Sequence, residues 1–419
     1  MERVSIGLKC GIVAAMIMIG SAASTPAWSQ TTASTSFAAN WVATWSSAPM
    51  PPGSATLPPV SFQNQTIRQV VHISAGGGLV RVRLSNTFGV APLVIGDAHV
   101  ALSATGSSIV PGSDHALTFS GQSSITIPVG ALALSDPVLL PVPSLANLTI
   151  SIFVPNNTGS ATYHDSADQT EYISGPGDFT ATTTFPTVQT DTSRYWLSGV
   201  DVAPLGRVNT VVVLGDSIGE GFRSTVDADR RWPDDLSARA NSPYGPPRLA
   251  VNNQSIGCSR LLTDICGTSG SSRFDRDVLA QTGVTHLILD LGLVDIVFAA
   301  VTGDPTQAVT AQQVITGLSQ LIQRAHARGV KVIGATITPN EGSTFPGFFT
   351  PANEAERQTV NHWIRTGGAY DGVIDFDAAV RDPSDPARLL PAYASIDNTH
   401  LSDAGYAAMA NAIDLSLFR

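Results

Sequence analysis

Residues of three types that together perform nucleophilic chemistry stand at the two ends of the C-terminal half of the sequence. Residues 211–217 read Val-Val-Val-Leu-Gly-Asp-Ser, which predicts a buried strand that runs into a tight turn carrying a serine. Near the C-terminus, Asp397 and His400 stand three positions apart. A serine hydroxyl is a poor nucleophile at neutral pH unless an imidazole accepts its proton and a carboxylate fixes the tautomer of that imidazole. The sequence therefore predicts Ser217 as nucleophile, His400 as its base and Asp397 as the orienting acid.

The spacing of Asp397 and His400 gains its meaning from its position in the chain. Residues three apart within one turn can direct their side chains the same way, although an Asp-x-x-His pair also occurs as a helix cap beside a surface histidine. This pair immediately precedes an apolar helical pattern over residues 404–417, in the last connection of a region whose first connection holds Ser217. That placement favours a catalytic pair.

The composition predicts a two-domain protein. The 419 residues are 43% hydrophobic and 13% charged, which is more chain than one hydrophobic core usually organises. A change of pattern places the boundary near residue 205, with an all-β accessory domain over 36–205 and a catalytic domain over 206–419. The net charge of -10, without a cluster of Lys and Arg, argues against a nucleic-acid partner.

The first 29 residues are typical of an export signal. Arg3 and Lys9 precede an apolar run over residues 10–23, and Ala27-Trp28-Ser29 is a plausible small-x-small cleavage site. We expect a mature chain that is secreted or periplasmic. No later stretch reaches the roughly 18 apolar residues that a membrane helix requires, so no integral membrane segment is expected in the mature chain.

Residues 41–202 alternate in the manner of half-buried strands. The clearest strands cover 67–73, 80–84 and 148–152, and Gly76-Gly77-Gly78 predicts a hairpin between the first two. Because no long helical period is present, the region favours a β-sandwich or jelly roll. It either grips a sugar through exposed aromatic residues or covers one side of an enzyme. Three isolated histidines are interpreted as surface or turn residues: His99, His115 and His164.

Beyond residue 205, apolar strands alternate with helical patterns, which specifies a parallel sheet between helices. The expected helices include 311–328 and 353–365. Ligands of such sheets gather beyond the carboxyl ends of the strands, where Ser217 would lie. The expected strands are 210–214, 248–252, 286–291, 330–336 and 372–376.

Together these residues resemble the SGNH/GDSL hydrolase family, specifically bacterial secreted members with an N-terminal β-domain. The resemblance implies a flavodoxin-like α/β/α sandwich with a parallel sheet, and ester hydrolysis through an acyl-enzyme. It implies Ser217, His400 and Asp397 as the catalytic triad, no cofactor and no metal. The expected substrate is a small-molecule, lipid or acylated carbohydrate ester. Four blocks carry the resemblance: Gly215-Asp216-Ser217 with Arg231-Trp232-Pro233-Asp234, residues 253–260, Gly292-Leu293-Val294-Asp295, and Asp397–His400.

The two middle blocks depart from the family pattern where it binds the oxyanion of the tetrahedral intermediate. Cys258 occupies the position of a family glycine, and Gly257 stands one residue earlier, so the N–H of either residue is a candidate to join that of Ser217 in the oxyanion hole. Val294 replaces the family asparagine and has no side-chain donor. Loss of one donor typically costs about 10²–10³ in turnover. A weakened oxyanion hole is therefore expected.

The remaining candidates concern the substrate pocket and its surroundings. A loop over residues 340–349 is expected to border the acyl pocket, although a loop packed on the domain core would have the same composition. Arg260 and Arg273 are expected to be solvated surface residues rather than anion ligands. Asp295 is expected to support its loop. The possible pocket residues are Asp216, Val294, Asp295, Phe345, Phe348 and Phe349.

Cys258 and Cys266 are predicted to form a short-loop disulfide in an oxidising compartment, where such a bridge adds roughly 2–3 kcal/mol. The alternative is a pair of unlinked thiols. Zinc is disfavoured because no histidine or further cysteine lies at ligand spacing.

Three other interpretations stay open. Gly215 to Gly219 also fit the Gly-x-Ser-x-Gly elbow of α/β-hydrolases, but the glycines that follow Ser217 make the immediate helix required by that elbow unfavourable. A second interpretation is a catalytically degenerate protein that binds carbohydrate or envelope material on the same fold. A third is action on a glycosidic bond through carboxylates such as Asp216 and Asp295. The oligomeric state is not indicated by the sequence.

Overall fold

The computed structural model describes residues 40–53, 58–242 and 248–419. The predicted export signal over residues 1–29 lies outside this range, as does its cleavage site. Among the described residues, none of the helices has both the length and the apolar character needed to cross a bilayer.

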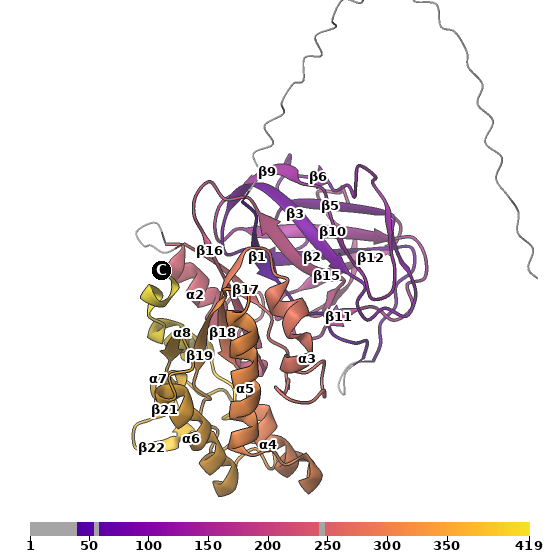
Figure 1. The fold of residues 1–419 in the computed structure, drawn as a ribbon. Coiled ribbons are helices and arrows are strands. Elements are labelled where there is room, and N and C mark those ends of the chain that lie inside the picture. Colours follow the sequence, from indigo (N-terminus) through magenta and orange to yellow (C-terminus); the bar gives the residue numbers. More distant parts are fainter. Residues whose placement is uncertain (1–39, 54–57, 243–247) are drawn as a thin grey trace, which may run out of the picture. The chain divides into compact units, whose positions relative to one another are not determined.

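The N-terminal region contains two antiparallel sheets that share one hydrophobic core, which makes it a β-sandwich (Figure 1). Residues of β3 such as Val82 and residues of β10 such as Ile150 belong to the same buried cluster. The first sheet runs β1 (Val42–Ser46), β15 (Leu197–Val202), β3 (Gly77–Ser85) and β8 (Leu132–Leu134), with β9 (Val138–Val142) also paired to β3. The second runs β13 (Thr187–Asp191), β12 (Glu171–Pro176), β2 (Gln65–His72), β10 (Asn147–Val154), β5 (Asp97–Leu102) and β6 (His115–Ala116). Two short pairs join β4 (Leu93–Ile95) to β7 (Ile125–Ile127) and β11 (Tyr163–His164) to β14 (Arg194–Tyr195).

The predicted hairpin at Gly76–Gly78 is wrong, because β2 and β3 belong to different sheets. The chain passes from one sheet to the other at these glycines. A Cβ at Gly76 would lie 2.3 Å from the carbonyl oxygen of Val142, and a Cβ at Gly77 would lie 2.6 Å from that of Ala203. The glycines therefore serve close backbone approach, which is the other use of a residue without a side chain.

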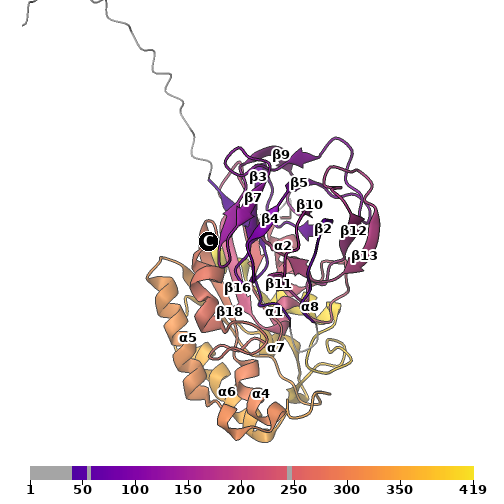
Figure 2. The same ribbon diagram turned by 90° about the vertical axis from the view of Figure 1, so that its right-hand side faces the viewer.

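The C-terminal region is built on a parallel five-stranded sheet. In sequence order its strands are arranged 2-1-3-4-5, the flavodoxin-like order. Figure 2 shows this sheet with its helices. The strands across the sheet are β17 (Leu249–Asn253), β16 (Asn209–Gly215), β18 (Val284–Asp290), β19 (Lys331–Ala335) and β20 (Gly372–Ile374).

The two faces of β16 are buried under different helix layers, so its apolar run does not alternate with polar residues. Val211 and Val213 join one cluster, and Val212 and Leu214 join the other. The first cluster contains residues of α2 (Trp232–Ala240), α7 (Phe376–Val380) and α8 (Asp403–Ala412). The second contains residues of α3 (Gly270–Phe274), α4 (Leu293–Thr302), α5 (Ala311–His326) and α6 (Pro351–Thr366). The expected α/β/α sandwich is confirmed.

Local capping determines where the helices begin and end. Thr310 and Gln313 form a capping box that starts α5. The last predicted helix, over 404–417, is shorter, since α8 ends at Ala412. Asp414 then accepts a hydrogen bond from the N–H of Ser416 and starts a separate 3₁₀ turn over Leu415–Phe418.

The β-sandwich packs against the edge of the parallel sheet. The backbone N–H of Ala43 donates to the carbonyl of Thr282 at 2.9 Å, and the side-chain amide of Asn252 donates to the carbonyl of Ala43 at 2.7 Å. Ala250 and Ile256 of the C-terminal region belong to the core of the sandwich. The N-terminal region therefore contacts segments that lead directly to the candidate site.

Candidate active site

The turn after β16 presents Ser217 at the carboxyl end of the parallel sheet, as residue one of the four-residue helix α1 (Ser217–Glu220). Asp216 caps this helix, since its carboxylate accepts a hydrogen bond from the N–H of Ile218 at 2.9 Å. Gly221 ends the helix in the left-handed conformation with φ 88°. The next helix, α2, begins only at Trp232, so the long helix that an α/β-hydrolase elbow requires does not follow the serine.

The structure brings Ser217, His400 and Asp397 together. The Nε2 atom of His400 lies 2.8 Å from the Oγ of Ser217, and its Nδ1 lies 3.0 Å from the Oδ2 of Asp397. The backbone N–H groups of Thr399 and His400 donate to the Oδ1 of Asp397 at 3.0 and 2.9 Å. One turn of chain therefore fixes the acid and the base, and Asn398 closes this turn with φ 54°.

The carboxyl of Asp397 is held in its ionised form. Burial by itself would raise the pKa of Asp397, but the hydrogen bonds and the charge of His400 outweigh it, and the pKa lies well below its ordinary value. The Nε of Arg223 lies 3.1 Å from the same Oδ2 atom that His400 contacts. An ionised carboxylate accepts from both groups.

Aromatic rings surround the imidazole of His400. Phe222 packs edge-on at 4.8 Å between ring centroids, Phe345 packs edge-on at 6.0 Å, and Phe348 lies 5.3 Å from Phe345. Three hydrogen bonds tie the expected pocket loop to the catalytic turn. The N–H of Thr344 donates to the carbonyl of Asp397, the amide of Asn398 to the carbonyl of Gly342, and the hydroxyl of Thr399 to that of Ser343. The predicted loop therefore borders the triad.

Phe349 makes no ring contact with another aromatic side chain in the described part of the chain. Phe222 and Arg223, by contrast, contact the triad and were not identified from the sequence. The sequence carries one signal for these two residues, the glycines at 219 and 221. They predict a helix that ends early, so that the residues after it lie against the nucleophile turn.

The second block separates the two oxyanion candidates. The N–H of Gly257 donates to the Oε1 of Glu220 at 2.9 Å, so this donor is already engaged. Cys258 adopts φ 50°, in the left-handed region that a glycine would favour, and its sulfur is bonded to Cys266 with the two Cα atoms 5.8 Å apart. Within the described residues, the N–H groups of Ser217 and Cys258 make no hydrogen bond to protein.

In the third block, Val294 is the second residue of α4 and is 6% exposed. Asp295 next to it accepts hydrogen bonds from the N–H groups of Leu261 and Leu262 at 2.6 and 3.1 Å. Burial raises the pKa of Asp295, while these hydrogen bonds oppose that rise. The carboxylate therefore fixes the loop after the second block. Both Asp216, as the cap of α1, and Asp295, at this loop, accept hydrogen bonds from backbone N–H groups.

The expectation that Arg260 and Arg273 are solvated is wrong, because they are 2% and 1% exposed. Arg273 donates to the carbonyl of Gly215 at 3.1 Å and also to the carbonyl of Gln254, so it ties the nucleophile turn to the second block. Arg260 donates to Gln307 at 3.0 Å and lies over the ring of Phe298. A buried arginine that bonds carbonyls has no distinct sequence signature.

The histidines of the β-sandwich also differ from the expected surface positions. His164 is 7% exposed and lies 3.3 Å from Glu220 of the nucleophile helix. His99 is 9% exposed and lies between Asp97 and Asp114. Of the three histidines considered in the sequence, His115 alone is partly exposed. Asp97 lies in the same strand as His99, whereas Asp114 and Glu220 come from other segments that the strand pattern does not indicate.

Residues 213–408 match the GDSL-like Lipase/Acylhydrolase family. Among curated proteins, none matches the chain. Solved structures similar to it include a GDSL-like lipase from Bacteroides thetaiotaomicron at 18% identity, which covers 50% of this chain and 87% of that one with a TM-score of 0.38. A carbohydrate acetylesterase from Sinorhizobium meliloti is 15% identical and covers 49% and 95% of the two chains with a TM-score of 0.38. An aryl esterase from M. smegmatis is 14% identical and covers 49% and 95% with a TM-score of 0.39.

Proposed function

We propose, from the premise that residues 213–408 are a GDSL-like lipase/acylhydrolase domain, that this chain is a serine esterase that cleaves carboxylic esters through an acyl-enzyme. The observation that carries the proposal is the continuous relay of hydrogen bonds from Ser217 through His400 to Asp397. A nucleophile, a base and an orienting acid within hydrogen-bond reach are what nucleophilic catalysis by serine requires. A protein that only binds carbohydrate has no chemical use for this relay.

In the proposed mechanism, His400 accepts the proton of Ser217 at Nε2 while the Oγ attacks the ester carbonyl. Asp397 keeps the other proton of the imidazole on Nδ1 and stabilises the imidazolium that forms. The imidazolium then protonates the departing alcohol. A water molecule, deprotonated by the same nitrogen, releases the acid from the acyl-serine.

The negative oxygen of the tetrahedral intermediate needs preorganised donors. We assign the N–H groups of Ser217 and Cys258 to this role, because Gly257 already donates to Glu220. Val294 supplies no side-chain donor. The proposed oxyanion hole therefore has two backbone donors. We expect a lower turnover than an oxyanion hole with three donors would give.

The surroundings of His400 favour an ester whose alcohol is apolar or carries a ring. His400 protonates the leaving alcohol, so groups beside its imidazole also lie beside that alcohol. Phe222 and Phe345 occupy these positions. A lipid and an acylated carbohydrate both fit this description, since aromatic faces pack against either. We also propose an export signal over residues 1–29 and a division between two domains at 205/206.

Hydrolysis of p-nitrophenyl esters from acetate to decanoate tests the proposal, with Ser217→Ala beside the unmodified chain. Ser224→Ala serves as the matched control, because this serine follows in the same segment and its backbone N–H donates to the carbonyl of Gly221. We expect Ser217→Ala to lose both hydrolysis and labelling by a fluorophosphonate, and Ser224→Ala to keep them. If the unmodified chain were as inert as Ser217→Ala and remained unlabelled, the esterase assignment would be wrong.

A further inference from the structure

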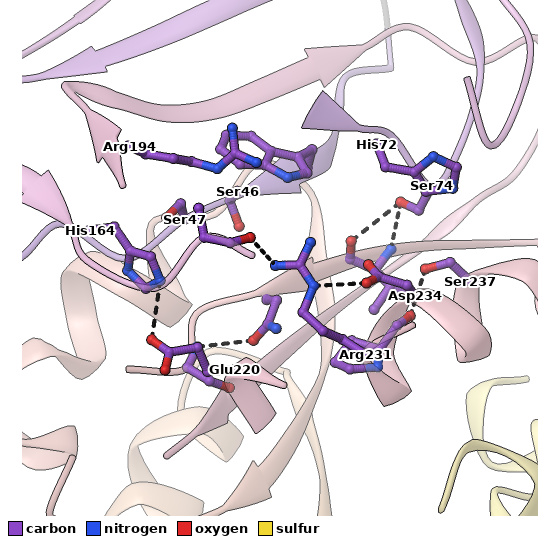
Figure 3. A pocket seen from close by; sticks show the side chains of 16 residues that line it. Ser46, Ser47, His72, Ser74, His164, Arg194, Glu220, Arg231, Asp234 and Ser237 are labelled. Atoms are coloured by element: carbon purple, nitrogen blue, oxygen red, sulfur yellow. Dashed lines mark hydrogen bonds and ion pairs between the residues drawn. The ribbon is translucent and has the colours of Figure 1, made fainter. Parts of the chain in front are cut away.

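A buried histidine of the β-sandwich contacts the helix that carries the nucleophile. The Nε2 of His164, in β11, lies 3.3 Å from the Oε1 of Glu220, which is the last residue of α1 and is 2% exposed. Figure 3 shows this pair in a small polar cavity together with Arg194 and Arg231. The cavity has a volume of about 30 Å³, which is room for about one or two water molecules and not for a substrate.

The hydrogen-bond partners of His164 require the imidazole to carry two protons. Its Nδ1 lies 3.0 Å from the carbonyl oxygen of Ala48, and its Nε2 faces the carboxylate of Glu220. A carbonyl and an ionised carboxylate only accept hydrogen bonds, so both ring nitrogens have to donate. Burial alone would lower the pKa of His164, but the hydrogen bond and charge of Glu220 outweigh it and the pKa is raised.

The same carboxylate oxygen of Glu220 holds the second block of the site. It accepts the N–H of Gly257 at 2.9 Å, and Gly257 directly precedes Cys258. A second bond links the same segments, from the side-chain amide of Asn253 to the carbonyl of Gly219 at 2.7 Å. Glu220 therefore connects the nucleophile helix, the β-sandwich and the residue before the proposed oxyanion donor.

We propose that His164 is a positioning residue, whose imidazolium fixes Glu220 and through it the peptide that presents the N–H of Cys258 to the oxyanion. This inference rests on the proposed esterase function. It gives the β-sandwich a part in the reaction of the neighbouring domain. His164 touches no reacting atom and acts only through Glu220.

The proposal fixes the sign of a pH effect. The charged groups that interact with His164 are Glu220, Asp165 and Asp168, and Arg194, Arg231 and Asp234 line the same cavity. A raised pKa means that the imidazolium is retained at low pH and lost as the pH rises through that value. When the imidazolium loses a proton, His164 can no longer donate to both the carbonyl of Ala48 and the carboxylate of Glu220. We therefore expect kcat to fall on the alkaline side of the ordinary histidine value, with little change in KM.

His164→Gln is the decisive variant, and His99→Gln is its matched control. His99 is also a buried histidine of the sandwich between two acceptors, with Asp114 at 2.7 Å and Asp97 at 3.4 Å, but it does not reach the nucleophile turn. We expect His164→Gln to lower kcat about tenfold, less than the roughly 10²–10³ for removal of a donor, with KM within about twofold. The alkaline fall in kcat should flatten in His164→Gln and persist in His99→Gln.

Gly257→Ala perturbs the same contact from the opposite side. A Cβ at Gly257 would lie 2.7 Å from the Oε2 of Glu220, so the carboxylate has to move. We expect a similar loss in kcat, and a double variant with His164→Gln that is less impaired than the product of the two single effects. If His164→Gln does not fold, Glu220→Gln replaces it, because the amide oxygen still accepts the N–H of Gly257 but carries no charge to hold the imidazolium.

Hydrogen exchange of the segment over residues 254–262 gives a readout that does not depend on activity. The amides of this segment should exchange faster in His164→Gln than in the unmodified chain or in His99→Gln. Unchanged exchange together with unchanged kcat in a folded His164→Gln would overturn the inference while leaving the esterase intact. Absence of hydrolysis and of Ser217 labelling in the unmodified chain would instead overturn the proposed function.

Discussion

The two halves of the candidate site are built differently. Ser217, His400 and Asp397 are positioned by short turns, and each lies one hydrogen bond from the next. The oxyanion half, at residues 256–258 and 292–295, depends on Glu220, on a disulfide and on a helix whose second residue is a valine. Proton transfer here depends on local geometry, whereas stabilisation of charge depends on contacts between distant segments.

The largest effect should come from the acid of the proton-transfer half, through Asp397→Asn. The Oδ1 of Asp397 accepts two backbone N–H groups, so an amide would keep its oxygen there and place its NH₂ towards the Nδ1 of His400. The imidazole would then protonate on Nε2 and could not accept the proton of Ser217. We expect kcat to fall by about 10³–10⁴, as for loss of the correct tautomer in other triads.

Asp403→Asn is the matched control for this variant. Asp403 is an aspartate of the same C-terminal segment, and its carboxylate accepts from the N–H and hydroxyl of Thr225 rather than from the triad. Its kcat should stay within about twofold of the unmodified chain. Steady-state kinetics on p-nitrophenyl acetate measures both variants. A fall of less than tenfold in the kcat of Asp397→Asn would contradict the assignment of proton transfer to this half of the site.

The oxyanion half can be tested in the opposite direction, by a gain of activity. Val294→Asn introduces a side-chain donor at the position where the family pattern has asparagine. If the new amide reaches the oxyanion, kcat should rise by about tenfold or more, because one donor is worth roughly 10²–10³ and the new one would not be fully preorganised. KM should change little, since the charge exists only in the transition state.

Val294→Thr provides the control, because it adds polarity of similar size with a hydroxyl too short to replace an amide. An unchanged or reduced rate in a folded Val294→Asn would contradict the assignment of the third block. Since Val294 is only 6% exposed, the stability of both variants has to be measured beside their kinetics.

The proton-transfer half could be predicted from sequence because its signals are local. A buried strand followed by Gly-Asp-Ser, and an Asp-x-x-His turn before the last helix, each determine their own geometry. The parallel sheet was equally accessible, since residues 211–214 are apolar on both faces and the helices α5 and α6 have clear caps. The order of the strands was expected only through the resemblance to the SGNH/GDSL family, which implies a flavodoxin-like sheet, and the layer of each helix comes from the structure.

The contacts of the oxyanion half could not be predicted, because they pair residues far apart in sequence. His164 and Glu220 are separated by 56 positions, and Arg273 reaches the carbonyl of Gly215 across 58. A buried charged side chain looks like a surface residue in a single sequence. The hairpin prediction at residues 76–78 is wrong for the same reason, since the carbonyls that approach Gly76 and Gly77 belong to the distant residues Val142 and Ala203.

The smallest effect concerns the disulfide, which restrains the oxyanion half. Cys258 and Cys266 are eight positions apart, and closing so short a loop should contribute about 2.5 kcal/mol to the free energy of unfolding by restricting the unfolded chain. Cys258→Ser with Cys266→Ser should therefore lower the stability measured in urea by about that amount.

The same double variant separates stability from positioning. Cys258 carries the proposed oxyanion N–H in a left-handed conformation, φ 50°, which the disulfide and the bond from Gly257 to Glu220 hold from two sides. Because the second restraint remains in the double variant, we expect kcat to fall only about threefold, and reduction of the unmodified chain to reproduce that loss. Mass spectrometry without reductant provides the check: two alkylatable thiols in the unmodified chain would exclude the bridge. A larger loss in kcat, approaching that for a missing donor, would mean that the disulfide rather than Glu220 sets the geometry of the oxyanion hole.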